Sequence, residues 1–465
     1  MRRLVAFLVL NYLSQCWAQT TLSIPSQTQQ QVTSGQSALT LAIPQAPTAL
    51  NLSVALCSTN SPFPRFFVGN GSAVSNPTTD TAGDEIFLDG GVAFWSGSGP
   101  ATLYAFPTSG GTGARFFEVA LTQDQAIFRR NESAPLFGDS TSTQAIVFSP
   151  PFLDAPINEP SYPNYTLPNA NLSDASPPPA APSQTLLLYQ TSNISSLVAE
   201  FNQSFCGMPL IPGNVVATGK ELTKSVVLRD SSGWRTQFII EGLTPSTNYT
   251  AFIIEADGSS VTQPLYFTTK STSFPCSLVH SLPYCPAVAY SVPLPPPQSP
   301  STTYFPGNLP SDIADPLVSS IGNFSTSLLT FACGRDIYSP LQSCADCQEA
   351  YREWACAVSL PRCAESPSNN PTPAPALQAS NSTGATRSSN IPPLGKQFTE
   401  LLPCVETCYQ VQRACPSFLG WQCPAYRVNA NASYGIGFID SEKKPLGGFP
   451  GAAQDDFGNV FCNMP

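Results

Sequence analysis

The chain is poor in charged residues and has almost no histidine. Asp, Glu, Lys and Arg make up 11% of its 465 residues, against about 25% in ordinary globular proteins. His280 is the only histidine, so a Ser-His-Asp or Cys-His catalytic arrangement would need it, and zinc sites built from several histidines are excluded. The formal net charge of −10 argues against a nucleic-acid partner.

Long apolar runs are also missing beyond the first residues. Arg2 and Arg3 precede the apolar run 4–10, and Ala18 offers a small residue at a cleavage position. This pattern predicts a secretory signal peptide over 1–18; a retained anchor is the alternative. No later stretch approaches the roughly 18 apolar residues of a membrane-spanning helix, so we expect membrane association through a partner or a retained signal.

Cysteines and glycosylation sequons are abundant. Signal cleavage removes Cys16 and two arginines, which leaves 14 of 15 cysteines and changes the net charge from −10 to −12. An even number suits a disulfide framework in an oxidising compartment. N-glycosylation sequons lie at Asn51, Asn70, Asn131, Asn164, Asn171, Asn193, Asn202, Asn248, Asn323, Asn381 and Asn431. We therefore expect a glycoprotein of the secretory pathway.

Period-two apolar alternation predicts two β-rich segments. Residues 19–148 suggest a β-sandwich, and 184–271 suggest a second, fibronectin-III-like sandwich with a tyrosine corner at Tyr249. Proline-rich segments predict a linker over 149–183 and a connector over 272–325.

Residues 326–465 predict a mainly helical, disulfide-rich domain with a disordered insertion at 365–393. Two helical patterns, starting near Cys344 and Cys404, carry cysteines on one face. We expect no metal or redox site at the Cys344-x2-Cys347 pair, and structural disulfides instead. The cysteines concerned are Cys333, Cys344, Cys347, Cys356, Cys363, Cys404, Cys408, Cys415, Cys423 and Cys462. Their connectivity and the roles of Cys57 and Cys206 stay open.

The cysteine-rich run carries a family resemblance. Cys344-x2-Cys347-x3-Tyr351-Arg352-x-Trp354-x-Cys356, followed by Pro403-Cys404-x3-Cys408-x6-Cys415-Pro416 and Leu419-Gly420-x2-Cys423-Pro424, resembles the fungal mating-induced-death family, a stretch-activated calcium-channel component. This region is also similar to Frizzled-type domains and to the auxiliary subunit of the animal sodium-leak channel.

The resemblance implies a regulatory subunit that does not form the pore. Its partner would be a large four-repeat pore-forming calcium-channel subunit. It would support calcium influx under stretch, mating factor or ER stress, at the extracellular face of the plasma membrane and in the ER. Exposed aromatics near Tyr351, Trp354, Trp421 and Tyr434 are candidate contacts; for Tyr351 and Trp354 the alternative is a place in the core, which is commoner for such residues.

Other functions have less support in the sequence. Paired acids such as Asp84-Glu85 are expected by chance among 30 acidic residues, so we predict no enzyme, no catalytic residues, no metal and no cofactor. A neutral loop residue is the favoured interpretation of His280. The alternative function is a secreted or cell-wall glycoprotein that adheres or binds a ligand.

Overall fold

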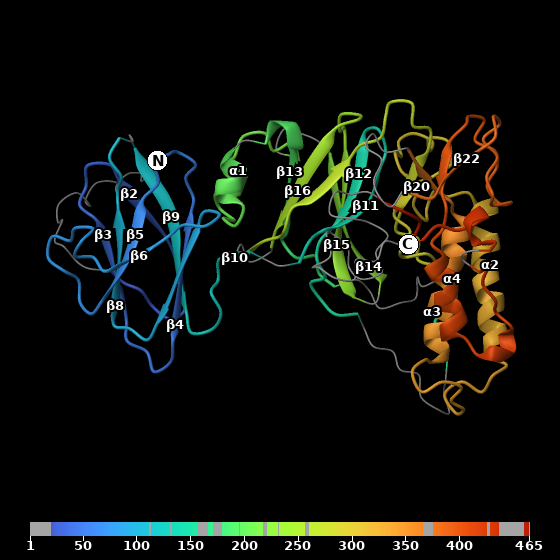
Figure 1. Ribbon diagram of the computed structural model, residues 1–465, viewed down its shortest axis with the longest axis horizontal. Helices are drawn as coiled ribbons and strands as arrows, with labels where there is room; N and C mark the ends of the chain where they lie inside the picture. Colours follow the sequence, from blue (N-terminus) through green and yellow to red (C-terminus); the bar gives the residue numbers. More distant parts are fainter. Residues whose placement is uncertain are drawn as a thin grey trace, which may run out of the picture. The chain divides into compact units, whose positions relative to one another are not determined.

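The computed structural model describes most of the chain (Figure 1). The described residues are 20–110, 113–130, 133–155, 166–170, 179–194, 196–216, 221–230, 232–255, 260–365, 375–425, 428–436 and 460–464. They divide into two compact units. Unit 1 falls within Met1–Asn131, Ser195–Pro212 and Asp257–Val261, and unit 2 within Glu132–Ile194, Gly213–Ala256 and Thr262–Pro465. The predicted signal peptide lies outside the described residues.

Unit 1 is a β-sandwich (Figure 1). One sheet has the order β1-β3-β8-β5-β6 and the other β2-β9-β4-β7. The strands are β1 (Thr20–Thr21), β2 (Ser26–Thr33), β3 (Leu39–Ile43), β4 (Leu50–Leu56), β5 (Arg65–Asn70), β6 (Asp84–Ile86), β7 (Val92–Gly97), β8 (Ala101–Phe106) and β9 (Ala114–Thr122). Leu50, Leu52 and Val54 alternate along β4 and so share one face of the strand, where all three are fully buried. Ser53 and Ala55 on the opposite face are also buried, Ala55 in a cluster with Phe128.

A segment from much later in the chain completes unit 1. Helix α1 (Ser196–Phe201) and the 3-10 turn η3 (Met208–Leu210) belong to it. Phe205 packs with Phe128, at a ring-centroid distance of 5.1 Å, in a cluster with Ala55 and Ala120. The Cys57–Cys206 disulfide fastens this segment to the end of β4. The short strands β10 (Arg129–Arg130) and β17 (Ser260–Val261) pair in parallel.

Unit 2 begins with a second sandwich (Figure 1). One sheet has the order β11-β12-β15-β14, and in the other β16 pairs with β13 and β18. The elements are β11 (Leu136–Ser140), β12 (Gln144–Phe148), β13 (Thr185–Gln190), η2 (Thr191–Asn193), β14 (Leu222–Asp230), β15 (Gly233–Glu241), β16 (Asn248–Ile254) and β18 (Leu265–Thr268). The hydroxyl of Tyr249 accepts a hydrogen bond from the Thr244 backbone N–H at 2.9 Å, which is the geometry of a tyrosine corner.

The sandwich boundaries differ from those in the sequence prediction. Strands β11 and β12 fall inside the predicted first sandwich, 19–148, yet β12 pairs with β15 of unit 2 along its whole length. Residues 196–212 fall inside the predicted second sandwich but fold in unit 1. Alternation identifies a strand, but it does not identify the sheet that the strand joins.

The predicted proline-rich connector, 272–325, is part of the core of unit 2. It contains β19 (Ser277–Val279), β20 (Tyr290–Val292) and most of helix α2 (Ser311–Leu328). Its buried apolar side chains include Leu282, Val288 and Leu309. The composition resembles a linker, but burial of these apolar side chains offsets the entropy cost of ordering the backbone.

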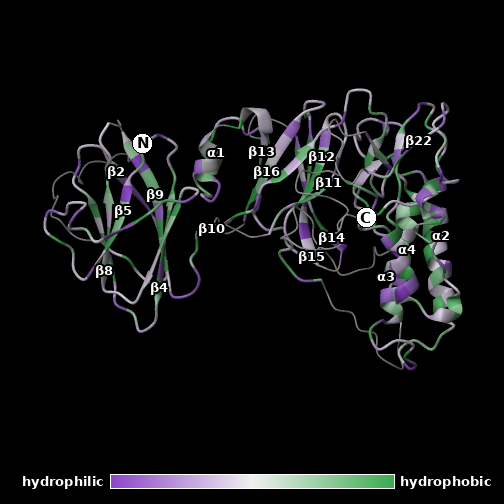
Figure 2. Ribbon diagram, in the orientation of Figure 1, coloured by the Kyte–Doolittle hydropathy of each residue, from purple (hydrophilic) through white to green (hydrophobic). Residues whose placement is uncertain are grey.

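Helices α2, α3 (Cys344–Ser359) and α4 (Val405–Ala414) build the cysteine-rich part, and Figure 2 shows hydrophilic and hydrophobic residues along each of them. A capping box starts α3, since Ser343 and Asp346 exchange side-chain to backbone hydrogen bonds. The remaining elements are β21 (Arg362–Ala364), β22 (Leu377–Ala379), β23 (Thr399–Leu401), η5 (Ser417–Leu419) and η6 (Ala430–Ala432). The architecture of β-sandwiches followed by a mainly helical, disulfide-rich region is confirmed.

Two segments predicted to be loose are ordered where the structure describes them. In the predicted insertion 365–393, β22 pairs with β23 and Ile391 is buried. In the predicted linker 149–183, the carbonyls of Asn169 and Ala170 accept hydrogen bonds from Arg352 of α3. Specific partners far along the chain order these segments, and composition does not report such partners. Among the described residues, no helix combines the length and the apolar character needed to cross a membrane.

Candidate interaction surface

Seven disulfides join the 14 described cysteines. The pairs are Cys57–Cys206, Cys276–Cys363, Cys285–Cys356, Cys333–Cys344, Cys347–Cys415, Cys404–Cys462 and Cys408–Cys423. Eight of the ten predicted cysteines pair with each other. Cys356 and Cys363 instead pair with cysteines of the predicted connector. The connector and the helices are therefore one covalently cross-linked framework.

The aromatic residues predicted as partner contacts mostly pack against each other. Tyr351 stacks on Phe324 with ring centroids 3.7 Å apart, and Trp354 and Trp421 meet edge to face at 4.7 Å. The indole N–H of Trp354 donates to the Tyr434 hydroxyl at 3.0 Å. These half-buried side chains hold α2, α3 and the chain after α4 together, so their first role is structural.

Exposed apolar side chains gather instead at one end of the helices. Leu329 follows α2, Ile337 and Leu341 lie in the loop before α3, and Phe418 lies in η5 after α4. Their exposed fractions are 46%, 85%, 84% and 54%. We call these four residues the apolar tip. Phe331 connects its two parts, with its ring 6.0 Å from Phe418 and 5.5 Å from Tyr338.

The loop that carries the tip is held firmly. The Cys333–Cys344 disulfide closes it. The Tyr338 hydroxyl lies 2.6 Å from the carbonyl oxygens of both Ser343 and Ala414, which share its single O–H donor. Ile337 and Leu341 are thus presented on a fixed backbone.

A hollow of about 300 Å³ lies beside Phe418. Its lining residues are Gln412, Cys415, Pro416, Ser417, Gly420, Trp421 and Gln422. The buried indole N–H of Trp421 has no acceptor among the described residues. The hollow is therefore lined by the amide side chains of Gln412 and Gln422, whereas the indole N–H of Trp421 is buried away from it.

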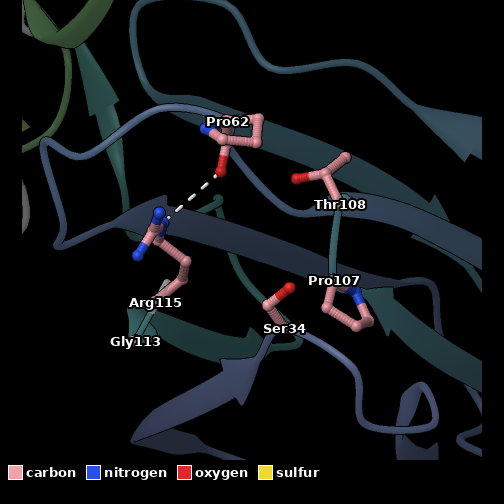
Figure 3. A pocket seen from close by; sticks show the side chains of 6 residues that line it. All are labelled: Ser34, Pro62, Pro107, Thr108, Gly113 and Arg115. Carbon is pink, nitrogen blue, oxygen red and sulfur yellow. Dashed lines mark hydrogen bonds between the residues drawn. The ribbon is translucent and has the colours of Figure 1, made fainter. Parts of the chain in front are cut away.

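A second cavity, in unit 1, is too small for a ligand (Figure 3). Its volume of about 10 Å³ is close to the minimum for one water molecule. Figure 3 shows Arg115 at its edge, where the guanidinium donates to the Pro62 carbonyl at 3.4 Å.

His280 is a loop residue, as predicted, and its side chain is buried. Its ring nitrogens lie 2.9 Å from the Ser281 hydroxyl and 3.0 Å from the Thr303 hydroxyl. Burial lowers the pKa of His280 to about 4, so the ring is neutral at physiological pH. No carboxylate hydrogen-bonds to this ring in the described part of the chain, and a Ser-His-Asp arrangement is not formed there.

One cluster has the composition of a metal site but not its chemistry. Sulfur atoms of Cys404 and Cys462 and a carboxylate oxygen of Glu406 lie within 4.8 Å of one another. The two sulfurs form a disulfide, so neither is a thiolate that could bind a metal.

The predicted glycosylation sites are mostly accessible where they are described. Asn70, Asn248, Asn323, Asn381 and Asn431 are exposed, and Asn51 and Asn202 are half-buried. Asn193 ends η2. Asn131, Asn164 and Asn171 lie outside the described residues. The loop that carries the apolar tip contains no sequon.

Comparison with known proteins identifies relatives over most of the chain. Residues 18–453 match the Mid1 family, described as a stretch-activated Ca²⁺-permeable channel component. The stretch-activated cation channel MID1 of Cryptococcus neoformans is 35% identical over 375 residues, which cover 71% of this chain and 59% of that protein. Stretch-activated cation channel yam8 of Schizosaccharomyces pombe is 29% identical over 283 residues, covering 57% of this chain and 54% of that protein.

The chain thus matches little more than half the length of these two relatives. A solved pre-peptidase C-terminal domain of a Bacillus anthracis collagenase is 8% identical, with a TM-score of 0.17, and covers 22% of this chain and 92% of that domain; a likeness this weak carries no argument. The family match covers nearly the whole sequence, and the chain belongs to the Mid1 family of stretch-activated Ca²⁺-permeable channel components.

Proposed function

We propose that the chain is an extracellular regulatory subunit of a plasma-membrane calcium-channel complex and does not itself form the pore. The observation that carries the proposal is the family match over residues 18–453. The pore would belong to a large four-repeat calcium-channel subunit, and the complex would admit calcium in response to stretch, mating factor or ER stress.

The chemistry of the chain supports an extracellular position. Its seven disulfides suit an oxidising compartment, since cytosolic thiols are kept reduced. Exposed sequons in both units suit a glycoprotein that passes through the secretory pathway. Two β-sandwiches and a cross-linked helical region also provide ample rigid surface for binding another protein.

A subunit of this kind acts by binding the open and closed states of the pore subunit unequally. A bound protein shifts such an equilibrium only by its difference in affinity for the two states. The regulatory role therefore requires a contact with the pore subunit that changes when the pore opens.

The proposal is tested in a fungal strain that lacks its own member of the family. Expression of the full chain should restore calcium uptake after exposure to mating factor. A Cys356→Ser variant serves as a control for folding, because it breaks the buried disulfide to Cys285. Wild-type chain that reaches the cell surface without restoring uptake contradicts the proposal. Its recovery with cell-wall glycans would favour the alternative of a wall glycoprotein.

A further inference from the structure

We propose that residues 196–212 form a covalent clasp through which tension passes from unit 2 into the sandwich of unit 1. We call this segment the clasp. It folds in unit 1, but on either side of it, at Ile194 and at Gly213, the chain belongs to unit 2. The inference goes beyond the proposed function, because it concerns a mechanical property of the chain itself.

The base of the clasp is fastened within unit 2. The Leu188 backbone N–H, on β13, donates to the side-chain oxygen of Asn214 at 3.2 Å. The Val215 backbone N–H donates to the Leu188 carbonyl at 2.7 Å. The chain that enters the clasp and the chain that leaves it are therefore tied together beside β13. Because β13 pairs with β16 along its whole length, a pull on the clasp acts on the second sandwich.

The other end of the clasp is packed into unit 1. The side chains of Phe201, Ser204 and Met208 are fully buried. The Ser204 hydroxyl donates to the Leu56 carbonyl at 2.6 Å. These contacts fix the position of the clasp, but they are noncovalent and separate when enough tension is applied.

The Cys57–Cys206 disulfide adds a covalent anchor at this end. Cys57 directly follows β4, which pairs with β9 on one side and with β7 on the other. A load that reaches Cys57 therefore enters an interior strand of the sheet, and pulling that strand out would break two ladders of hydrogen bonds. The clasp and its disulfide thus link the second sandwich covalently to an interior strand of the first.

The direct connection between the units has weaker anchors in unit 1. The chain leaves unit 1 after β10 and enters unit 2 before β11. Strand β10 is two residues long and pairs with β17, which is equally short. Phe128, just before β10, is buried, and its ring lies 5.1 Å from that of Phe205 in the clasp. Under tension these noncovalent anchors give way before a disulfide does.

The two connections have similar reach, so both come under load. Leu136, at the start of β11, follows Arg130 by six residues, which span at most about 20 Å. Asn214 follows Cys206 by eight residues, which span at most about 28 Å. Once the anchors of the direct connection yield, the clasp therefore carries the tension after little further extension. The family of this chain is described as stretch-activated, and a response to stretch requires a path that transmits tension.

The test slackens the clasp without breaking it. Flexible Gly/Ser segments of about 20 residues are inserted after Ile194 and after Gly213, on either side of the clasp. Gly213 is exposed and its surroundings are open. Lengthening a loop costs little stability, so the disulfide and the packing of the clasp should form normally. The matched control carries the same two insertions after Gly35 and Gly110, exposed glycines of unit 1 that also lie in open space.

Optical tweezers measure the response of each purified full chain to tension. DNA handles are attached to azidophenylalanine introduced in place of Phe87 in unit 1 and Ile337 in unit 2, which are 77% and 85% exposed. In the slackened chain the direct connection carries the load alone. With two connections of similar reach sharing the load in wild type, we expect slackening to lower the first rupture force roughly twofold, and the control insertions to leave it unchanged.

A further variant separates the bearing of tension from stabilisation. Replacing Cys57 and Cys206 together by serine removes the covalent anchor and should lower the first rupture force as slackening does. If the serine variant ruptures at a lower force while the slackened chain behaves as wild type, the disulfide only stabilises unit 1 and the proposal is overturned. Equal rupture forces in all the chains would also overturn it. Because no partner protein takes part, failure of the proposed function would leave this result unaffected.

Discussion

Asp139 is predicted to be essential for the stability of unit 2. Its side chain, on β11, is 1% exposed and lies 3.3 Å from Arg362 and 3.8 Å from Lys270. Its oxygens also accept from the backbone N–H groups of Ser291 and Ser140. Burial by itself would raise the pKa of Asp139, but the two cations and the two N–H groups outweigh burial and lower it. The carboxylate therefore links the second sandwich to the connector and the cysteine-rich part.

An Asp139→Asn substitution keeps the shape but removes the charge. Arg362, itself 6% exposed, would then lose its buried partner, which typically costs about 3–5 kcal/mol. Unit 2 comprises about 310 residues, so each kcal/mol lowers its melting temperature by about 1.5 °C. We therefore expect the thermal transition of unit 2 to fall by about 5–8 °C.

Scanning calorimetry on the purified full chain measures this shift, with the two units resolved as separate transitions. Asp336→Asn is the matched control, because its partner Arg335 is solvent-exposed, and it should leave the transition unchanged. Since the folded-state pKa of Asp139 is lowered, its contribution is present above pH 3.8 and is lost as the pH falls further. A transition of Asp139→Asn within about 1 °C of wild type at pH 7 would refute the reasoning.

Three further predictions concern stability and folding. Replacing Cys57 and Cys206 together by serine opens a loop of 149 residues. Because the unfolded chain gains entropy, unit 1 should lose about 5 kcal/mol of stability, measured as a fall in its melting temperature. An unchanged melting temperature would argue against a stabilising role for this disulfide. Burial raises the pKa of Glu400 from 4.5 to about 7, so the free energy of unfolding should fall as the pH rises through that range. The Glu400→Gln variant should therefore be more stable than wild type by up to about 3 kcal/mol at pH 8 and by little at pH 4. Equal melting temperatures of variant and wild type at pH 8 would count against this prediction. Cys356→Ser leaves Cys285 without its partner and should cause retention in the ER, measured as the secreted fraction; normal secretion would contradict this.

Local patterns in the sequence predicted local structure well. Alternating apolar residues over Leu50–Leu56 became β4, and the one-face cysteines after Cys344 became α3. The tyrosine corner at Tyr249 also formed as predicted. Each of these features depends on residues close together in the sequence, where the periodicity of the backbone determines which side chains share a face.

Features that depend on distant partners could not be predicted. Spacing does not determine disulfide connectivity, so the pairing of Cys356 with Cys285 had to come from the structure. The transfer of residues 196–212 to unit 1 depends on contacts such as Phe205 with Phe128. The apolar tip gave no periodic signal, because exposure of Ile337 and Leu341 results from how the loop is held rather than from a repeating pattern.

The most direct test of the central claim is to identify what binds the wild-type chain in the membrane. The tagged protein would be purified from mild-detergent membranes and its co-eluting proteins identified by mass spectrometry. Membership of the Mid1 family and the proposed regulatory role predict a large four-repeat cation channel as the main specific partner. Recovery of the chain alone, or only with cell-wall polymers, would contradict the proposed role as a channel subunit.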